Sequence, residues 1–175
     1  MKDLNKMSKQ IFPASHLQTA INGLSQLINP ICEKHGGGIV FVCVMKGGFM
    51  FFSDLIKKIK YPIEVDFIKC SSYDGFKQKE IEIHYDIEVD VKDKTVFLVD
   101  DILDSGATMK ALIGHFKVLG AKHVETVSAV YKENLDFPNH LYIYKQPKNE
   151  NPWYIGYGMD GPKGYSRNLD TIHKL

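Results

Sequence analysis

Hydrophobic residues follow two different spacings along this chain, and together they predict alternating strands and helices. An unbroken apolar run at 39–45 is typical of a central parallel strand, and a shorter apolar, β-branched run at 95–99 predicts a second strand buried on both faces. Before the first run, apolar residues recur at helical spacing. We expect this helix to begin at Ser15, with a capping box completed by Gln18, and to kink or end at Pro30.

The remaining periodicities complete the pattern. They predict helices at about 49–59 and 109–119 and strands at 62–70, 81–88, 123–131 and, more weakly, 141–144. The strands at 62–70 and 81–88 enclose a polar stretch, which fits a β-ribbon with a mobile tip or a disordered surface hairpin. The order of elements predicts an α/β fold with a central parallel-dominated sheet, flanking helices and right-handed crossovers. Ligands should bind at the carboxyl ends of the strands.

Composition places the chain among globular proteins and limits its partners. Its 175 residues, 44% hydrophobic and 25% charged, suffice for one domain with its own core. A formal net charge of +1 gives no whole-chain attraction to nucleic acid or to an acidic membrane. The three cysteines are widely spaced, and the sequence shows neither a signal-peptide core nor an apolar run long enough to span a membrane. We therefore expect free thiols and a cytoplasmic location.

A short turn before the helix at 109–119 carries candidate chemistry. It reads Asp-Ser-Gly-Ala-Thr at 104–108. The first N–H groups of a helix have no partner within the helix, and the helix dipole adds about half a positive charge there, so a phosphate fits this end. Gly106 permits close approach of the backbone, while Ser105 and Thr108 supply hydroxyl donors. The turn is therefore a candidate phosphate site.

Two adjacent carboxylates, Asp100 and Asp101, stand between the strand at 95–99 and that turn. They would repel a phosphate, so they must face either vicinal hydroxyls or a divalent cation that bridges oxygen ligands. A phosphate beside two carboxylates suggests a sugar phosphate with magnesium. The simpler alternative is an ordinary βα turn in which Asp and Ser only start the helix.

A second motif follows the strand at 39–45. It reads Lys46-Gly47-Gly48. A lysine among glycines at the carboxyl end of a strand can offer an ammonium group and bare backbone N–H groups to an anion. A plain glycine turn with a solvated lysine would have the same sequence.

Three stretches resemble one known family. The residues at 96–108, Val-Phe-Leu-Val-Asp-Asp-Ile-Leu-Asp-Ser-Gly-Ala-Thr, resemble the phosphoribosyl diphosphate (PRPP) signature of type I phosphoribosyltransferases. Met-Lys-Gly-Gly-Phe at 45–49 resembles the diphosphate loop of the hypoxanthine-type purine members, in which the peptide before the lysine can be cis. The run at 153–160 resembles their purine-binding segment. The likeness covers about 39–169.

The resemblance implies a reaction and an architecture. The reaction is transfer of the 5-phosphoribosyl group from PRPP to N9 of hypoxanthine, and also of guanine, with Mg²⁺ as cofactor and diphosphate as product. The architecture is the type I phosphoribosyltransferase fold in a single domain, 1–175, with a core at about 36–132 and a small hood from 1–14 and 133–175. Members of this family usually form homodimers or homotetramers, and we expect the same here.

The resemblance also assigns roles to individual residues. Asp104 is the candidate general base or acid at the imidazole ring of the purine. PRPP or nucleotide would be bound by Asp100, Asp101, Ile102, Leu103, Asp104, Ser105, Gly106, Ala107 and Thr108. Diphosphate would be bound by Lys46, Gly47 and Arg167, and the purine by Lys132, Trp153, Tyr154 and Asp160. Asp160 would hold the metal, with Asp100 and Asp101 as further candidate ligands. Ser72 and Tyr73 would belong to a mobile loop that closes over the reacting centre.

Two other classes remain open. The spacing Asp-Asp-x-x-Asp at 100–104 also occurs in prenyl diphosphate enzymes. Those enzymes place it on a helix, whereas the strand-like run at 95–99 and the glycine turn argue against a helix here. A non-enzymatic regulator that senses PRPP or nucleotides on the same fold could keep the PRPP motif.

Overall fold

The computed structural model describes residues 8–74, 79–132, 137–161 and 163–175. Its larger sheet has six strands in the order β4-β3-β2-β5-β6-β7. In that order the strands span Lys79–Tyr85, Glu64–Asp74, Ile39–Met45, Thr95–Leu103, His123–Lys132 and Leu141–Gln146. All neighbouring pairs in the series β3-β2-β5-β6-β7 are parallel. β4 runs antiparallel to β3 and forms the predicted ribbon with it. This confirms the α/β class and the parallel-dominated sheet.

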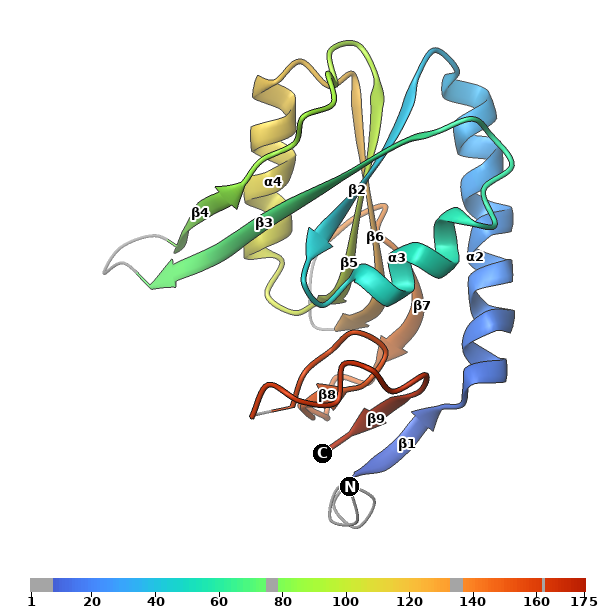
Figure 1. Ribbon diagram of the computed structural model, residues 1–175, viewed down its shortest axis with the longest axis vertical. Helices are drawn as coiled ribbons and strands as arrows, with labels where there is room; N and C mark the ends of the chain where they lie inside the picture. Colours follow the sequence, from blue (N-terminus) through green and yellow to red (C-terminus); the bar gives the residue numbers. More distant parts are fainter. Residues whose placement is uncertain (1–7, 75–78, 133–136, 162) are drawn as a thin grey trace.

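Helices cover both faces of this sheet (Figure 1). α2 (Ala14–His35) and α3 (Phe49–Ile56) lie on one face, and α4 (Ala107–Val118) lies on the other. Neighbouring residues of β2 pack against the helices on opposite faces of the sheet. Phe41 belongs to the core with α2 and α3, whereas Val42 belongs to the core with α4. A strand between two helical layers is buried on both sides, which explains its unbroken apolar run. Among the described residues, no helix is long and apolar enough to cross a membrane.

The first helix begins differently from the prediction. α2 starts at Ala14, with Pro13 at the N-cap and no side-chain capping bond, so the predicted capping box is wrong. Gln18 instead donates from Nε2 to Oδ2 of Asp54 on α3, at 3.0 Å. A proline is tolerated at the start of a helix because its missing N–H would have no partner within the helix there. A contact between two helices has therefore replaced the local cap.

The ends of two helices also differ from the prediction. α2 does not end at Pro30 but continues to His35. A proline removes one backbone hydrogen bond, but Ile28 and Cys32 on either side of it are fully buried, so packing continues the helix past that point. α3 is shorter than predicted, ending at Ile56 rather than near 59.

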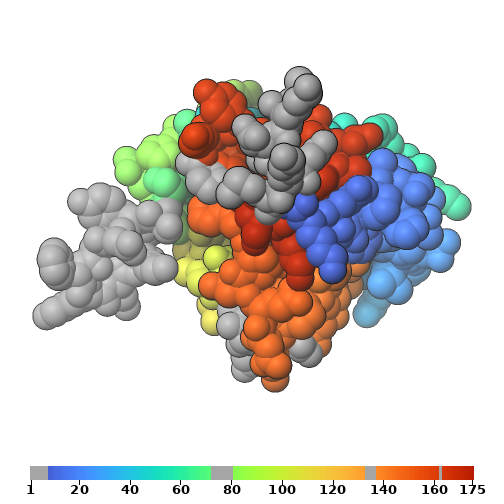
Figure 2. All heavy atoms as spheres, turned by 90° about the horizontal axis from the view of Figure 1, so that it is seen from below, coloured from blue at the N-terminus to red at the C-terminus, as the bar shows by residue number. Residues whose placement is uncertain are grey.

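Both ends of the described chain meet in a second, three-stranded sheet. β1 (Lys9–Phe12), β9 (Ile172–Lys174) and β8 (Tyr154–Ile155) lie side by side in that order. In Figure 1 this sheet lies beyond the carboxyl ends of the parallel strands, and Figure 2 shows N-terminal and C-terminal residues next to each other over that end. β7, by contrast, belongs to the larger sheet, although the predicted hood included its residues.

A buried histidine joins β6 to the segment before β7. His140 is 8% exposed; its Nε2 lies 2.8 Å from Oγ of Ser128, and its Nδ1 lies 2.8 Å from Oγ1 of Thr126. The Ser128 hydroxyl donates its proton to the carbonyl of Val130 at 2.7 Å. It therefore accepts from Nε2–H of the histidine, and Nδ1 accepts from the Thr126 hydroxyl. This arrangement suits a neutral imidazole, and burial lowers the pKa of His140 to about 4.

We expect His140 to make the protein sensitive to acid. The pKa is near 6.5 in the unfolded chain and about 4 in the folded one, so its contribution to stability is fully present above the unfolded pKa and is lost as the pH falls toward the folded pKa. The total loss should be on the order of 3 kcal/mol. Urea unfolding at about pH 7 and about pH 4.5 should therefore show a smaller acid-induced loss for His140→Gln than for the wild type. Equal losses would contradict this role.

Candidate active site

The paired acids lie within a strand and not after it. β5 spans Thr95–Leu103, so the prediction that the strand stops at residue 99 is wrong. Pairing with β6 continues past the acids, with Asp100 opposite Ser128 and Leu103 opposite Tyr131. Because β6 is long enough to pair with them, the carboxylates are held on the rigid carboxyl-terminal part of a central strand.

The two carboxylates influence each other. Burial raises the pKa of Asp100 well above its ordinary value, and the neighbouring Asp101 carboxylate raises that pKa further. Each carboxylate accepts a hydrogen bond from the next backbone N–H, Asp101 N to Asp100 Oδ1 and Ile102 N to Asp101 Oδ1, both at 2.8 Å. A cation or hydroxyl donors placed here would relieve the repulsion between the two acids.

The carboxylates near this site match the ligands of a magnesium ion only in part. In the described ranges, no group of three or more His, Cys, Asp or Glu side chains is arranged to hold a metal. Mg²⁺, however, is usually bound through one or two carboxylates together with phosphate oxygens and waters. The pair Asp100 and Asp101, and Asp160 across the pocket, therefore suit a magnesium ion that arrives with a phosphorylated ligand.

The Lys46 loop packs directly against these acids. The Met45–Lys46 peptide is cis, and the Lys46 side chain is exposed. A Cβ built on Gly47 would lie 1.8 Å from Oδ2 of Asp101, and a Cβ built on Gly158 would lie 2.1 Å from the carbonyl oxygen of Gly47. Only glycine fits both positions as the backbone and Asp101 stand. The loop after β2, the acids of β5 and the C-terminal segment therefore meet at one point.

The predicted phosphate turn leads into α4. Gly106 has the left-handed φ of 73° and precedes the first helical residue, Ala107. The N–H of Ala107 donates to Oγ of Ser105 at 3.3 Å, and the side chains of Asp104 and Ser105 are exposed. The helix start is therefore accessible to a ligand at the carboxyl end of the sheet.

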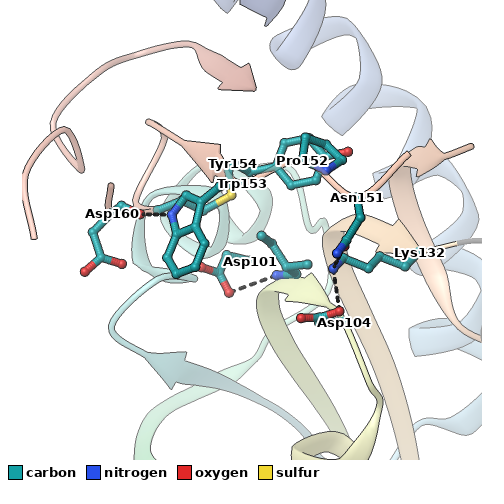
Figure 3. A pocket seen from close by; sticks show the side chains of 10 residues that line it. Asp101, Asp104, Lys132, Asn151, Pro152, Trp153, Tyr154 and Asp160 are labelled. Atoms are coloured by element: carbon teal, nitrogen blue, oxygen red, sulfur yellow. Dashed lines mark hydrogen bonds and ion pairs between the residues drawn. The ribbon is translucent and has the colours of Figure 1, made fainter. Parts of the chain in front are cut away.

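A pocket of about 380 Å³ lies between the end of the sheet and the C-terminal segment (Figure 3). This volume is within the usual range for small-molecule sites. Its lining is formed by Asp101, Ile102, Asp104, Lys132, Asn151, Pro152, Trp153, Tyr154, Met159 and Asp160. Asn151, Pro152 and Met159 were not predicted individually, although Met159 lies within the run at 153–160 that resembles a purine-binding segment. Amide, proline and thioether side chains carry no reaction chemistry of their own, so the residue types alone did not indicate a role.

The cationic side of the pocket is Lys132, the last residue of β6. Its side chain is only 12% exposed, and its Nζ lies 2.5 Å from Oδ1 of Asp104, whose side chain is 69% exposed. The same Nζ donates to Oδ1 of Asn151 at 3.0 Å. Figure 3 shows the ammonium between these two acceptors. A shielded ammonium beside a carboxylate can recognise a ligand oxygen and hold it next to a proton carrier.

The opposite side carries an aromatic ring and an ion pair. Trp153 is 57% exposed, and its indole N–H donates to the carbonyl of Asp160 at 2.7 Å. Nη2 of Arg167 lies 2.7 Å from Oδ2 of Asp160, and its Nη1 donates to the carbonyl of Gly158 at 2.7 Å. Arg167 thus holds in place the segment around Gly158, which contacts Gly47. An exposed indole anchored at one edge provides a flat surface on which a planar ring can stack.

The loop between Trp153 and Asp160 is also tied to α3. Tyr157 is 3% exposed, and its hydroxyl donates to Oδ2 of Asp54 at 2.7 Å. Burial and this bond to Asp54 raise the pKa of Tyr157 above its ordinary value. Tyr157 packs in the hydrophobic core, and its hydroxyl also links this loop to α3. It joins residues 103 positions apart in sequence.

The other predicted residues lie outside the pocket lining. Lys46 and Gly47 follow β2, and 105–108 lie at the start of α4. Ser72 and Tyr73 lie on β3, where the backbone pairs with β4. The tip of this ribbon, 75–78, falls outside the described residues, so the mobile loop stays a prediction.

The fold, together with the site at the carboxyl ends of the parallel strands, defines the class of protein to which this chain belongs. Residues 8–161 match the family model of the phosphoribosyl transferase domain, and the chain belongs to this family of enzymes. Hypoxanthine-guanine phosphoribosyltransferase of Staphylococcus aureus is 32% identical over 145 residues, which cover 82% of this chain and 80% of that protein. Hypoxanthine phosphoribosyltransferase of Salmonella typhimurium is 27% identical over 173 residues, covering 94% of this chain and 93% of that protein.

Solved structures agree. A crystal structure of hypoxanthine-guanine phosphoribosyltransferase from Bacillus anthracis, with a HEPES molecule in its active site, has a TM-score of 0.85 at 31% identity. The similarity covers 95% of this chain and 98% of that one. The expectation of a type I phosphoribosyltransferase fold is thereby confirmed, and the helical fold of the prenyl diphosphate enzymes is excluded.

Proposed function

We propose that the protein transfers the 5-phosphoribosyl group of PRPP to N9 of hypoxanthine and guanine, forming the 6-oxopurine nucleotide and diphosphate. One observation carries the choice of base, namely the shielded Lys132 ammonium beside an exposed Trp153 ring in one pocket. A 6-oxopurine presents an acceptor at C6, whereas adenine presents a donor there. A site that offers N–H donors therefore favours the oxygen.

Each neighbouring group has a complementary task. Trp153 stacks on the purine, and Asp104, paired with Lys132, exchanges a proton with the imidazole ring of the base. The turn at 104–108 binds the 5-phosphate at the start of α4, and Asp100 with Asp101 faces the ribose hydroxyls. In the transition state the ribose ring becomes positive and the departing diphosphate carries negative charge. Fixed carboxylates near the ring stabilise this separation.

Magnesium would neutralise part of the diphosphate charge as that group leaves. Asp160, Asp100 and Asp101 are the residues that would hold it. Lys46 and the backbone N–H groups of its loop would bind the diphosphate on the same side.

We expect nucleotide formation to require Mg²⁺, measured as product formed from PRPP and each of adenine, hypoxanthine, guanine and xanthine, with and without excess chelator. Full turnover in chelator would remove the metal from the proposal, and no turnover with any base would overturn the proposed function.

The role of Lys132 gives a separate expected result. Lys132→Ala should lower the preference for hypoxanthine over adenine, because the donor that meets the 6-oxygen and repels the 6-amino group is gone. Losing a charged hydrogen bond in a closed site costs about 1.5–3 kcal/mol, or roughly 10- to 100-fold in relative kcat/KM. An unchanged ratio of kcat/KM for the two bases would show that selectivity has another source.

Location and assembly also belong to the proposal. We propose a cytoplasmic enzyme that forms a homodimer or homotetramer, as the resemblance implies. Light scattering at several protein concentrations would distinguish these states from a monomer.

A further inference from the structure

Lys132 is held from two sides by unlike acceptors. Its Nζ lies 2.5 Å from the carboxylate of Asp104 and 3.0 Å from the amide oxygen of Asn151. An ammonium group has three N–H donors and no acceptor, so the amide must present its oxygen, and one donor remains for a ligand in the pocket. The direction of that donor depends on both acceptors.

The two acceptors respond differently to the reaction. In the proposed function Asp104 exchanges a proton with the purine, so its charge, and with it its hold on Lys132, changes during turnover. Asn151 is neutral and cannot titrate. It therefore keeps the ammonium in place whatever the state of Asp104, and it does so without cancelling the positive charge that the base would meet.

Asn151 also relates Lys132 to the stacking ring. It lies two residues before Trp153, and the residue between them is Pro152. A proline fixes its own φ and restricts the preceding residue to extended backbone, so these three residues form a stiff unit. Lys132 comes from the end of β6, on the other wall of the pocket. The bond between Asn151 and Lys132 therefore sets the offset between the ammonium and the plane of the indole (Figure 3).

We infer that Asn151 is a specificity-determining positioning residue, which acts through Lys132 to place an N–H donor where the 6-oxygen of a stacked purine lies. The inference rests on the proposed function, since it assumes that a 6-oxopurine fills the pocket. It assigns to Asn151 the part of base selectivity that depends on where Lys132 points.

The test is a double-mutant cycle read by binding. Trp153 is the single tryptophan of the chain and lines the pocket, so its fluorescence should report nucleotide binding directly. The variants are Asn151→Leu, which keeps the approximate size but removes the acceptor, Lys132→Ala, and both together. Asn149→Leu is the matched control, because it changes an exposed asparagine on the same segment outside the pocket lining. Inosine and adenosine 5′-monophosphates are the two probes.

Asn151→Leu should weaken binding of inosine monophosphate about tenfold relative to adenosine monophosphate, and should have no further effect once Lys132 is alanine. Asn149→Leu should bind both nucleotides as the wild type does. Equal losses with and without Lys132, or an unchanged ratio of the two nucleotides, would overturn the positioning role. A wild type that binds both nucleotides equally would instead contradict the proposed function, and the inference with it. Melting temperatures of the Asn151 and Lys132 variants equal to that of Asn149→Leu would show that their fold is intact.

Discussion

Replacing Asp104 with asparagine is expected to lower kcat about 10²- to 10⁴-fold while leaving PRPP binding largely intact, which is the usual loss when a general acid or base is removed. Asparagine keeps the size of the side chain and still offers an oxygen to the Lys132 ammonium, 2.5 Å away in the wild type, but it cannot carry a proton. Steady-state rates with hypoxanthine and calorimetric titration with PRPP would separate the two effects.

The acidic pair provides the matched comparison. Asp100→Asn and Asp101→Asn should weaken binding of PRPP or nucleotide, because in the proposed function these carboxylates face the ribose hydroxyls. They are held there on the rigid end of β5 and not in the exposed turn. The assignment would be reversed by an Asp104→Asn variant with normal kcat alongside an Asp101→Asn variant that loses only kcat. In that case the proton carrier would belong to the pair, while the family and the fold would stand.

The elements that sequence predicted well are those whose environment is uniform. β2 and the first part of β5 are buried on both faces, so their apolar runs indicate central parallel strands without any knowledge of their neighbours. The start of α2 is different. Its predicted cap at Ser15 had the right local pattern, but Gln18 instead donates to Asp54 on another helix. Local rules fail where a contact distant in sequence offers a better partner.

The same distinction applies to the site. The turn at 104–108 and the acids of β5 are contiguous in sequence, and their chemistry can be recognised there. The extension of β5 past residue 99 could not be predicted, since it depends on the length of β6 beside it. Nor could the bond from Tyr157 to Asp54 be predicted, which joins the Trp153 side of the pocket to the helix after the Lys46 loop. Asn151 becomes visible only when Lys132 is placed beside it.

Gly47→Ala is expected to lower kcat/KM by about 100-fold, a typical cost of moving a substrate-positioning group by about 1 Å. The new Cβ would lie 1.8 Å from Oδ2 and 2.4 Å from Cγ of Asp101. All the atoms that this Cβ would meet belong to the Asp101 side chain, so the carboxylate should turn away from the proposed ribose position, and the loss should appear chiefly as weaker PRPP binding. Steady-state kinetics with varied PRPP, together with melting temperatures, would measure both the catalytic and the structural effect.

Two glycines in helices serve as controls. A Cβ added at Gly23 in α2 or at Gly114 in α4 would meet no atom within 4 Å, so Gly23→Ala and Gly114→Ala should keep wild-type kinetics and gain about 0.5–1 kcal/mol of stability from better helix propensity. The mechanism of the Gly47 effect can be isolated further. If the alanine acts by displacing Asp101, then Asp101→Ala should cost much less in the Gly47→Ala background than in the wild type. Additive losses would mean that the methyl group disturbs the loop itself, and normal PRPP binding by Gly47→Ala would show that the close contact with Asp101 is not needed for the site.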